Sequence, residues 1–585
     1  MCLLALSYMC QGWYVFMLVL GLHSGPHDSA ASLFDDYTLI AAVSEERLNR
    51  KKCSGGFPDA SIDEVLRIAG RQRSDVDVVV ATRSFFKRSY FTHWRPHEKI
   101  RENFRRWTGK ERLREMNVVL GKDSASTAYD IFDCRSFLVD NGFRADARMF
   151  FANHHFSHAL PSLFFTDWEQ ALLYTADGSG DQVYYSHTLF KDGALTNLYG
   201  DDRWLGKTDA SGSVGLAYGF VTEALGWKMN RHEGKLTGLA AHGTPTLLAE
   251  MLKHFRLQDD GRIEMDFPNH AALRARFHDL AKSDSPENAA ASIQTLLEHC
   301  IFHSTSRLVE RHGIRRLGLA GGVFANVRLN RHLAENLPVD EIFVVPPMGD
   351  DGLVIGAALQ FLLERDGLQT WLKNRRRITN VYWGGDHNAQ VAPVFTAGGA
   401  RRVEGNPAQL TADWLAQGRI GAIYNGRMEF GPRALGARTI LASPANAGVN
   451  QSLNDRLDRS DFMPFAPVVT EADVNEVFDL PAASRYAANF MTVTCGVKDR
   501  WRDHIPAVVH VDRTARPQVI RRDDNALYFD ILEAFKVASG LPVLVNTSFN
   551  VHEEPIINRP EECLRALKEG RVDFVVTPEA IWLPE

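Results

Sequence analysis

Three histidines follow an apolar run in the segment FFANHHFSHAL, and two of them have a spacing that suits metal binding. In a helix, His154 and His158 lie four residues apart and share one face. Asp177 follows the apolar run ALLYTA, and Asp350 follows IFVVPP. Two histidines and two carboxylates suit a hard or borderline divalent ion such as Fe, Mn, Mg or Zn, whereas a lone histidine pair is more often structural. We therefore predict a metal site of these four residues, with His155 facing away and packing.

A further histidine, His27, stands beside Asp28 in the loop segment PHDSAAS. A loop histidine next to an acid can simply cap the segment that follows it. If this loop converges with the loop that carries Asp177, as a duplicated fold would require, His27 instead faces the metal and can act as a general base. Both interpretations stay open at this point.

A dense arginine loop, NGRMEFGPRALGAR, covers residues 425–438. Arg433 and Arg438 are separated only by glycine and apolar residues, and their planar guanidinium groups suit bidentate recognition of phosphate or carboxyl-phosphate groups. The segment DRTARPQ, which contains Arg516, and the polar run NTSFN, which contains Asn546 and Ser548, could add donors. Salt-bridged surface arginines are the alternative, which the interrupting glycines and apolar residues disfavour.

Two stretches of chain share one pattern of strands that could position these residues. Residues 17–22, 30–34 and 38–44 are predicted strands joined by a polar loop and a turn, and residues 171–176, 183–190 and 194–199 repeat the pattern. Two β-meanders of one design, each opening with a polar loop that contains glycine, predict a duplicated α/β unit. Such loops between paired strands are how actin-like ATPases bind phosphates through backbone N–H groups.

Length and composition predict a globular protein of several domains. A chain of 585 residues is too long for one simple domain. Its 45% hydrophobic and 24% charged residues exclude a disordered, collagen-like or multi-span membrane protein. A polar, basic stretch around residues 364–379 is the best candidate for a linker. We predict a first domain over 17–370, a linker over 371–379 and a second domain over 380–585.

The net charge and the cysteines indicate which binding partners and which cellular compartment to expect. The formal net charge of −6 supplies no overall field for binding nucleic acid, so no such partner is expected. The basic and aromatic stretch over 83–114 is interpreted as a solvated helical insertion, with a basic lid near an anionic substrate as the alternative. Seven scattered cysteines without a C-x-x-C pair favour a reducing cytoplasm over a disulfide framework or a thiolate zinc site.

The N-terminus raises the question of export, because residues 1–27 contain no charged side chain. No basic residue precedes the apolar run, and no clear small-x-small cleavage site follows it. Removing the run would also cut away the predicted strand at 17–22. We therefore favour Met17 as the true start, with residues 1–16 as a non-native or disordered extension outside the fold, and expect no membrane association.

Together these motifs resemble the O-carbamoyltransferase family, of the nodulation-protein U and the cephem and aminoglycoside carbamoyltransferase type. The resemblance spans nearly the whole chain from Met17. It rests on the ordered motifs HDSAAS, SEERLNRKK, HHFSH, ADGSG, EGKLTGLAAHG, AGGVFANVRLN, MGDDG, GRMEFGPRALGAR, FMPFAP, ARPQ and LVNTSFN.

The resemblance implies a fold and a two-step reaction. It implies an α/β protein whose N-terminal domain is like the actin-like tRNA threonylcarbamoyl transferases and whose C-terminal domain is like the synthases of threonylcarbamoyl-adenylate. The C-terminal domain would convert carbamoyl phosphate and ATP into carbamoyl-adenylate and pyrophosphate. The N-terminal domain would then pass the carbamoyl group to a hydroxyl of a small natural-product or sugar acceptor, releasing AMP. The implied cofactors are ATP and a metal ion, with Fe first and Mn or Mg next.

The resemblance also assigns roles to particular residues. His154, His158, Asp177 and Asp350 would be the metal ligands, and His27 the base at the acceptor. Aminoglycoside-type members have a lysine just before the PFAP motif, whereas residues 457–463 contain none, so Arg459 could supply that cation instead. The adenylate in the N-terminal site would be held by Lys235, Gly321, Gly322 and Asn326. The carbamoyl phosphate and ATP site would be formed by Arg433, Arg438, Arg459, Arg516, Asn546 and Ser548.

Two other function classes stay open. One is modification of a tRNA adenosine through a threonylcarbamoyl-type adenylate, which the acidic chain disfavours and the basic insertion keeps open. The other is a non-catalytic nucleotide-binding protein, which the combination of His27, the metal ligands and the arginine loop disfavours. No residue identifies the acceptor, and a homo-oligomer is left open.

Overall fold

The computed structural model describes residues 17–92, 100, 112–120, 127–200, 213–459 and 463–585. The predicted extension over residues 1–16 lies outside these described residues, as does most of the basic insertion between 93 and 111. The described end of the apolar run that raised the question of export forms a buried strand, β1 (Leu18–His23), at the centre of a sheet. Within the described part of the chain, no helix combines the length and the hydrophobicity that a membrane crossing needs.

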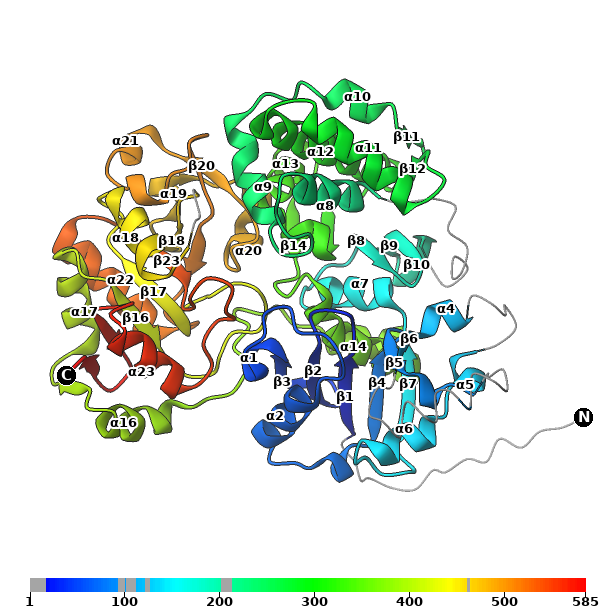
Figure 1. Cartoon of the computed structure of the whole chain (residues 1–585), viewed down its shortest axis with the longest axis horizontal. Helices are drawn as coiled ribbons and strands as arrows, with labels where there is room; N and C mark the ends of the chain where they lie inside the picture. The colour runs from blue at the N-terminus through cyan, green and yellow to red at the C-terminus, as the bar shows by residue number, and fades with distance from the viewer. Residues whose placement is uncertain (1–16, 93–99, 101–111, 121–126, 201–212, 460–462) are drawn as a thin grey trace, which may run out of the picture.

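The N-terminal half contains two five-stranded sheets of the same design (Figure 1). The first has the order β3-β2-β1-β4-β7, in which β1, β2 and β3 pair antiparallel and β4 and β7 add in parallel. The second, β10-β9-β8-β13-β14, repeats this arrangement of three antiparallel and two parallel strands. Besides β1, the strands are β2 (Ala30–Asp35), β3 (Thr38–Ser44), β4 (Val78–Thr82), β7 (Arg148–Ala152), β8 (Ala171–Gly180), β9 (Val183–Lys191), β10 (Ala194–Tyr199), β13 (Arg316–Ala320) and β14 (Glu341–Val344).

This repetition confirms the predicted duplicated, actin-like α/β unit, with one difference in the second copy. β8 extends to Gly180, so most of the predicted loop over 177–182 is strand. Its pairing with β9 shifts between Ala176 and Gly180, and such a bulge bends a strand and redirects its side chains. Asp181 and Gln182, with φ of 51° and 64°, then make the turn into β9. Two consecutive left-handed residues are what a tight hairpin turn requires.

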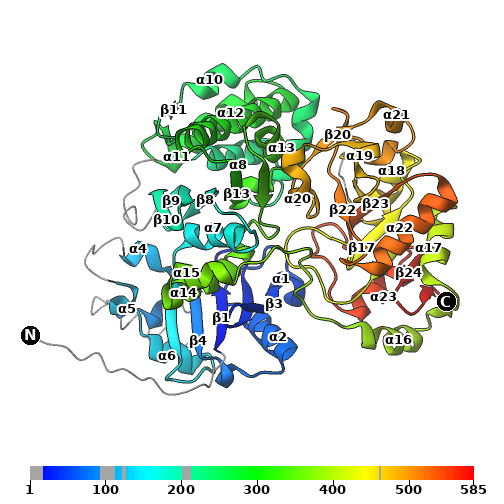
Figure 2. The ribbon, with the colours of Figure 1, turned by 180° about the vertical axis from the view of Figure 1, so that it is seen from behind.

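Two helices fill the space between these sheets, α7 (His154–Phe164) and α14 (Leu353–Asp366) (Figures 1 and 2). α7 packs on β8 and β13, α14 packs on β1 and β4, and the two helices contact each other. A Cβ atom on Gly356 would lie 1.6 Å from the carbonyl oxygen of Ser157, so glycine is needed for this close approach. Because Ser157 and Gly356 each lie in the first turn of their helix, the crossing brings His154 close to the residues that precede α14.

The C-terminal half is built on an eight-stranded sheet in the order β15-β25-β24-β16-β17-β23-β18-β22. Its neighbouring strands are antiparallel except for the parallel pairs β16–β24 and β18–β22. Alternate side chains such as Ile423 and Val468 point to one face, where they pack with α17 and α22. The strands are β15 (Arg401–Val403), β16 (Gly421–Tyr424), β17 (Arg438–Ala442), β18 (Ala466–Thr470), β22 (Gln518–Ile520), β23 (Val543–Ser548), β24 (Phe574–Val576) and β25 (Ile581–Leu583).

The remaining helices cover the sheets, and several begin at a capping side chain that accepts a backbone N–H, as Ser285 does for the longest of them. In the N-terminal half they are α1 (Glu46–Asn49), α2 (Asp59–Ala69), α4 (Met116–Leu120), α5 (Ala128–Ile131), α6 (Cys134–Asp140), α8 (Val214–Ala224), α9 (Glu233–Leu239), α10 (Leu248–Leu252), α11 (His270–Lys282), α12 (Pro286–His312), α13 (Val327–Asn336) and α15 (Leu368–Lys373). In the C-terminal half they are α16 (Asn388–Ala397), α17 (Pro407–Ala416), α18 (Gly448–Arg456), α19 (Val474–Val477), α20 (Arg485–Ala488), α21 (Asp499–Arg502), α22 (Ala526–Ser539) and α23 (Pro560–Lys568). Short strand pairs complete the chain: β5 (Phe85–Lys87) with β6 (Leu113–Glu115), β11 (Phe255–Leu257) with β12 (Ile263–Met265), and β19 (Phe478–Asp479), β20 (Cys495–Val497) and β21 (Thr514–Ala515) in one sheet.

The predicted linker over 371–379 is packed against both halves. Trp371 is fully buried in α15 and donates its indole N–H to the carbonyl of Leu359. Arg377 pairs with Glu341 and places its guanidinium 4.1 Å from the centre of the Tyr486 ring. The apolar stems of basic side chains cover hydrophobic surface, so a basic composition does not by itself imply an extended spacer. The domain boundaries at 370 and 380 stay a prediction.

Candidate active site: a histidine–aspartate cluster and a basic cavity

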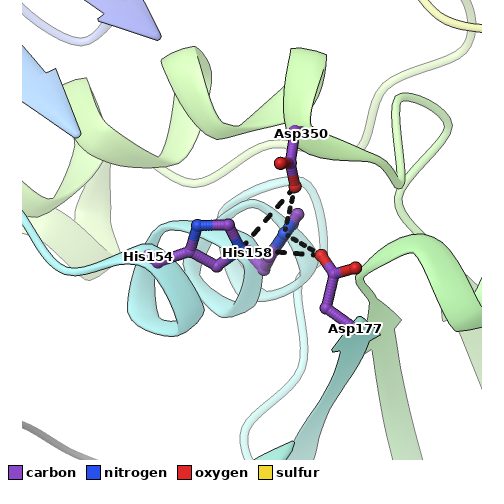
Figure 3. Close-up of side chains that lie close together, drawn as sticks. All are labelled: His154, His158, Asp177 and Asp350. Carbon is purple, nitrogen blue, oxygen red and sulfur yellow. Dashed lines mark hydrogen bonds and ion pairs between the residues drawn. The ribbon is translucent and has the colours of Figure 1, made fainter. Parts of the chain in front are cut away.

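The four residues predicted to bind a metal lie together between α7, β8 and the segment before α14 (Figure 3). One ligand atom from each of them lies within 4.8 Å of all the others. The Nε2 atom of His158 is 3.1 Å from Oδ2 of Asp177 and 3.5 Å from Oδ1 of Asp350. The Nε2 atom of His154 is 3.5 Å and 3.6 Å from the same two oxygens. Both imidazoles and both carboxylates are therefore directed at one point.

The backbone around these ligands is fixed by polar contacts that the sequence did not reveal. Asn153 caps α7 by accepting the N–H of Phe156 at 2.8 Å. Asp181 accepts the backbone N–H of His154 at 2.8 Å and is itself held by the side chains of Asn117 and Arg83. The first turn of α7 is thereby anchored to the hairpin that carries Asp177.

The electrostatics of this cluster favour a bound cation. Burial would raise the pKa of Asp177, but its close contacts with His154 and His158 hold it well below its usual range. Burial and the charge of Asp177 would also raise the pKa of Asp350, and the two histidines outweigh them. The Nε2 atom of His154 is buried without a hydrogen-bond partner among the described residues. Two ionised carboxylates beside an unpartnered imidazole nitrogen fit a divalent ion.

His155 faces away from this cluster, as its position in the helix predicts. Its Nδ1 atom lies 2.7 Å from the hydroxyl of Thr175, and its Nε2 atom lies 2.9 Å from the carbonyl oxygen of Val183. Burial lowers the pKa of His155 to about 3, so the ring is neutral. It is a satisfied core histidine.

His27 is bonded to Asp28, with 3.0 Å between Nδ1 and Oδ2, and its side chain is 33% exposed. This hydrogen bond raises the pKa of His27 to about 9, against the effect of burial and with further help from the charges of Asp350 and Asp177. The loop that carries His27 thus lies within electrostatic reach of the metal ligands, as convergence of the two loops requires.

His23 is a member of this region that sequence reasoning missed. Its Nε2 atom lies 3.8 Å from Oδ2 of Asp350, and its Nδ1 atom lies 2.8 Å from the hydroxyl of Thr82. Burial lowers the pKa of His23 to about 3. The signal was its place as the last residue of β1, where a polar side chain ends an apolar strand.

The two glycines predicted to hold an adenylate, Gly321 and Gly322, border the cluster. Gly321 has φ of 97°, and a Cβ atom on Gly322 would lie 3.2 Å from Oδ1 of Asp177. Asn326, by contrast, caps α13 and donates its amide to Gln294 at 2.8 Å. A Cβ atom on Gly321 would lie 2.2 Å from the carbonyl oxygen of Ala176, so this glycine allows close packing on β8. Gly322 leaves space beside Asp177, whereas the side chain of Asn326 is engaged within the protein.

A second centre is a cavity of about 680 Å³ between the two halves of the chain. Its walls are strongly basic. The N-terminal half contributes Lys52, Arg231, Lys235, Arg328 and Arg331, and the C-terminal half contributes Arg433, Arg459 and Arg516. Asp512 and Glu553 are the acidic side chains among the described residues that line it. A cavity with this charge suits an anionic ligand that carries several phosphates.

Arg433 and Arg516 meet in this cavity as the resemblance implies. Burial lowers the pKa of Arg433 to about 10, and burial together with the charge of Arg433 lowers the pKa of Arg516 well below its usual range. The Nε atoms of both are buried without a hydrogen-bond partner, and neither forms an ion pair within the described part of the chain. Two neighbouring guanidinium groups without a counter-ion are poised for a dianion.

Arg459, Asn546 and Ser548 line the same cavity. Arg459 donates to the hydroxyl of Thr547 at 3.0 Å and to the main chain of Ser548 and Asn550, so it braces the NTSFN segment. The amide of Asn546 donates to Gln518 at 2.7 Å. These side chains form the wall beside the arginine pair.

The structure does not bring Arg438 into the cavity. It is fully buried, and its guanidinium stacks 3.7 Å from the centre of the Tyr424 ring. It donates to the carbonyls of Asn425, Gly426 and Ala437. These bonds engage both terminal nitrogens of the guanidinium inside the protein, so its geometry supports a role in shaping the arginine loop and gives no support to the predicted phosphate contact.

Lys235 was expected in the N-terminal adenylate site and lies in the interdomain cavity. The other basic residues of the N-terminal half that line this cavity were missed. Lys52 belongs to the motif SEERLNRKK, which was noted only for its resemblance, and Arg231 lies two residues before the motif EGKLTGLAAHG. Their charge was visible in the sequence, but their placement opposite the arginine loop depends on how the two halves pack.

Comparisons with known proteins assign both halves of the chain to one family. Family models for the carbamoyltransferase N-terminus and C-terminus match residues 18–359 and 412–582. Nodulation protein NolNO of Sinorhizobium fredii is 35% identical over 572 residues, which cover 94% of this chain and 78% of that protein. Nodulation protein NolO of Bradyrhizobium diazoefficiens is 34% identical over 436 residues, which cover 72% of this chain and 77% of that protein. The crystal structure of HypF from T. kodakarensis aligns with 14% identity over 60% of this chain and 48% of that chain, with a TM-score of 0.36. On the family models and the nodulation proteins, this chain belongs to the carbamoyltransferase family and is a carbamoyltransferase enzyme.

Proposed function

We propose that this carbamoyltransferase uses ATP and carbamoyl phosphate to make carbamoyl-adenylate in the interdomain cavity, and then transfers the carbamoyl group to a hydroxyl of a small molecule. The observation that carries the proposal is the pair Arg433 and Arg516, which lie half-buried side by side without a counter-ion among the described residues. Their Nε atoms are buried without a hydrogen-bond partner in the described part of the chain. Two buried like charges are costly unless an anion neutralises them. The phosphates of the two substrates supply that anion, and planar guanidinium groups bind phosphate oxygens in pairs.

The first half-reaction would proceed in two chemical steps. Water would release phosphate from carbamoyl phosphate, leaving carbamate. A carbamate oxygen would then form a bond to the α-phosphorus of ATP, and the bond from that phosphorus to the pyrophosphate would break. The basic walls would neutralise the charge that develops on the phosphate oxygens. Because the cavity lies within the protein, it would also protect a mixed anhydride that hydrolyses easily in water.

The second half-reaction is assigned to the histidine–aspartate cluster. His27 would take the proton of the acceptor hydroxyl as its oxygen attacks the carbamoyl carbon, and AMP would leave. The four-residue cluster would hold a metal ion, for which we propose Fe before Mn or Mg. Such an ion supplies Lewis-acid chemistry at a phosphate oxygen. The space that Gly322 leaves beside Asp177 suits binding of the adenylate there.

Trapping of the activated carbamoyl group tests this function. The wild-type protein with ATP and carbamoyl phosphate should form AMP faster when hydroxylamine is added, because hydroxylamine attacks carbamoyl-adenylate without needing a natural acceptor. Omitting carbamoyl phosphate should abolish the effect. AMP formation that does not depend on carbamoyl phosphate would contradict the proposal.

The proposed metal site predicts how a substitution changes the metal content of the protein. His158→Ala should lower the bound metal from about one ion per chain to nearly none, because two histidines and two carboxylates are the complete proposed donor set. His299→Ala, on the exposed face of α12, is the matched control and should keep its metal. The measurement is elemental analysis of purified protein. Retention of metal by His158→Ala would show that the ion binds elsewhere.

The ionisation of His27 predicts a pH dependence. A general base must be neutral, so transfer should rise with pH until the pH exceeds the pKa of His27. The hydrogen bond to Asp28 raises that pKa. Asp28→Asn should therefore move the rise of the transfer rate to lower pH, by about one unit. The measurement is the pH profile of kcat/KM for the acceptor. A profile that stays in place or moves to higher pH would remove His27 from the role of base.

We also propose that the first domain covers residues 17–370 and the second residues 380–585, and that the protein works in the cytoplasm. The five cysteines in the described part of the chain are free thiols, as a reducing compartment requires.

A further inference from the structure

The carboxylate of Glu553 contacts several side chains across the interface between the two halves, at the edge of the cavity. Glu553 belongs to the loop that follows the NTSFN segment in the C-terminal half. Its Oε1 atom lies 2.9 Å from Nε2 of His232, and its Oε2 atom lies 3.2 Å from Arg231 and 3.4 Å from Lys228. All three partners come from the segment between α8 and α9 in the N-terminal half. Arg231, His232 and Glu553 also line the cavity.

The carboxylate of Glu553 is stabilised in its ionised form. Its partial burial would raise the pKa of Glu553, but the hydrogen bond with His232 and the charges of Arg231 and Lys228 lower it to about 2. The carboxylate therefore stays ionised at any pH at which the enzyme would work. Its side chain is 32% exposed, so part of this interaction is open to solvent.

The backbone at Glu553 adds an independent observation. Its φ is 62°, a left-handed conformation that glycine adopts more readily than glutamate. The loop is held in this shape from the other side as well, because Arg50 donates to the carbonyls of Pro555 and Ile556 at 2.7 Å and 2.8 Å. A bulky residue kept in an unfavourable conformation, with its carboxylate against Arg231, Lys228 and His232, points to a function of the side chain.

We propose that Glu553 is a positioning residue that clamps Arg231 and His232 against the interdomain cavity, so that the N-terminal half completes the polyphosphate-binding wall of the C-terminal half. This inference rests on the proposed function, since it gives the cavity an ATP phosphate as its ligand. Arg231 uses one end of its guanidinium for Glu553. A guanidinium oriented in this way loses less conformational freedom when it binds a phosphate. Formation of the adenylate would then need both halves of the chain, although the arginine pair lies in one of them.

The test is a set of variants measured for binding of a non-hydrolysable ATP analogue by calorimetry. Glu553→Gln keeps the size of the side chain and removes its charge. Glu553→Gly removes the side chain and suits the left-handed backbone, so the loop should keep its shape. Each is expected to weaken binding about tenfold, the size of one charge-assisted hydrogen bond. Glu554→Gln is the matched control, because that neighbouring carboxylate pairs with Arg565 and does not line the cavity, and it should bind within about twofold of the wild type.

A double-mutant cycle decides whether Glu553 acts through its partner. Arg231→Ala should weaken binding by a similar factor. Adding Glu553→Gln to it should change the affinity by less than about twofold, because Arg231, the guanidinium that Glu553 positions for the phosphate, is already gone. In turnover, Glu553→Gln should raise the KM for ATP and leave kcat within about threefold. Loss of thermal stability alone, with unchanged affinity, would mean that Glu553 is only an interface contact.

Three further results would overturn the inference. Tighter binding by Glu553→Gln would mean that the carboxylate competes with the phosphates, additive effects would mean that it acts apart from Arg231, and a wild-type protein that does not bind the analogue would have no such wall. A wild-type protein that binds the analogue but releases no pyrophosphate with carbamoyl phosphate would refute the proposed function and leave the clamp standing.

Discussion

His27→Ala is expected to lower carbamoyl transfer to an acceptor by about 10²- to 10⁴-fold, the usual contribution of a positioned general base. Pyrophosphate release from ATP and carbamoyl phosphate should stay within about twofold, because the arginine pair that serves this step lies in the other half of the chain. The measurement is the mass gain of one carbamoyl group on an acceptor found by screening hydroxylated molecules, beside pyrophosphate release by the same preparation.

Measuring both half-reactions on one variant makes the result specific to the transfer step. A misfolded protein would lose both half-reactions, so intact pyrophosphate release is the internal control. His27→Asn gives a second control, since it keeps a polar side chain beside Asp28 and lacks the base. If either substitution stopped pyrophosphate release, the division of labour between the two centres would be refuted.

Arg433→Ala is expected to reduce pyrophosphate release by at least about 10²- to 10³-fold, as is typical when a donor to developing charge is removed from a preorganised site. The fold should survive, because the substitution removes a like charge that lowers the pKa of the neighbouring Arg516. Thermal unfolding should therefore occur at the wild-type temperature or above it. The measurement is the rate of pyrophosphate release with both substrates saturating.

Two further variants serve as comparisons for Arg433→Ala. Arg433→Lys keeps the charge and loses the planar fork, so it should recover only part of the rate. Arg402→Ala removes an exposed arginine that pairs with Glu404 on an edge strand of the same sheet, and it should behave as the wild type. Normal release by Arg433→Ala would place the carbamoyl phosphate site elsewhere in the cavity.

Local patterns predicted the parts of the fold and of the site that depend on neighbours in the chain. The two meanders appear as β1–β3 and β8–β10, and the spacing of His154 and His158 sets both rings on one face of α7. His155 faces away for the same helical reason. Alternation and helical periodicity are encoded within a few residues, so they can be read from a single sequence.

Features that depend on packing between distant segments could not be predicted. Lys52 and Arg231 face the arginine loop only because the two halves meet around the cavity, which no local pattern encodes. Arg438 had the residue type and the loop context of a phosphate ligand, yet its terminal nitrogens donate to backbone carbonyls and its guanidinium stacks on Tyr424. His23 was hidden because it closes an apolar strand and touches Asp350 only through the fold.

Pyrophosphate release from ATP without any acceptor is the measurement that tests the central claim most directly. The wild-type protein should release pyrophosphate when carbamoyl phosphate is present and not when it is omitted, because carbamoyl-adenylate is proposed to form in the interdomain cavity before transfer. No release with carbamoyl phosphate, together with release when threonine and bicarbonate replace it, would contradict the account, since the cavity would then make a different adenylate.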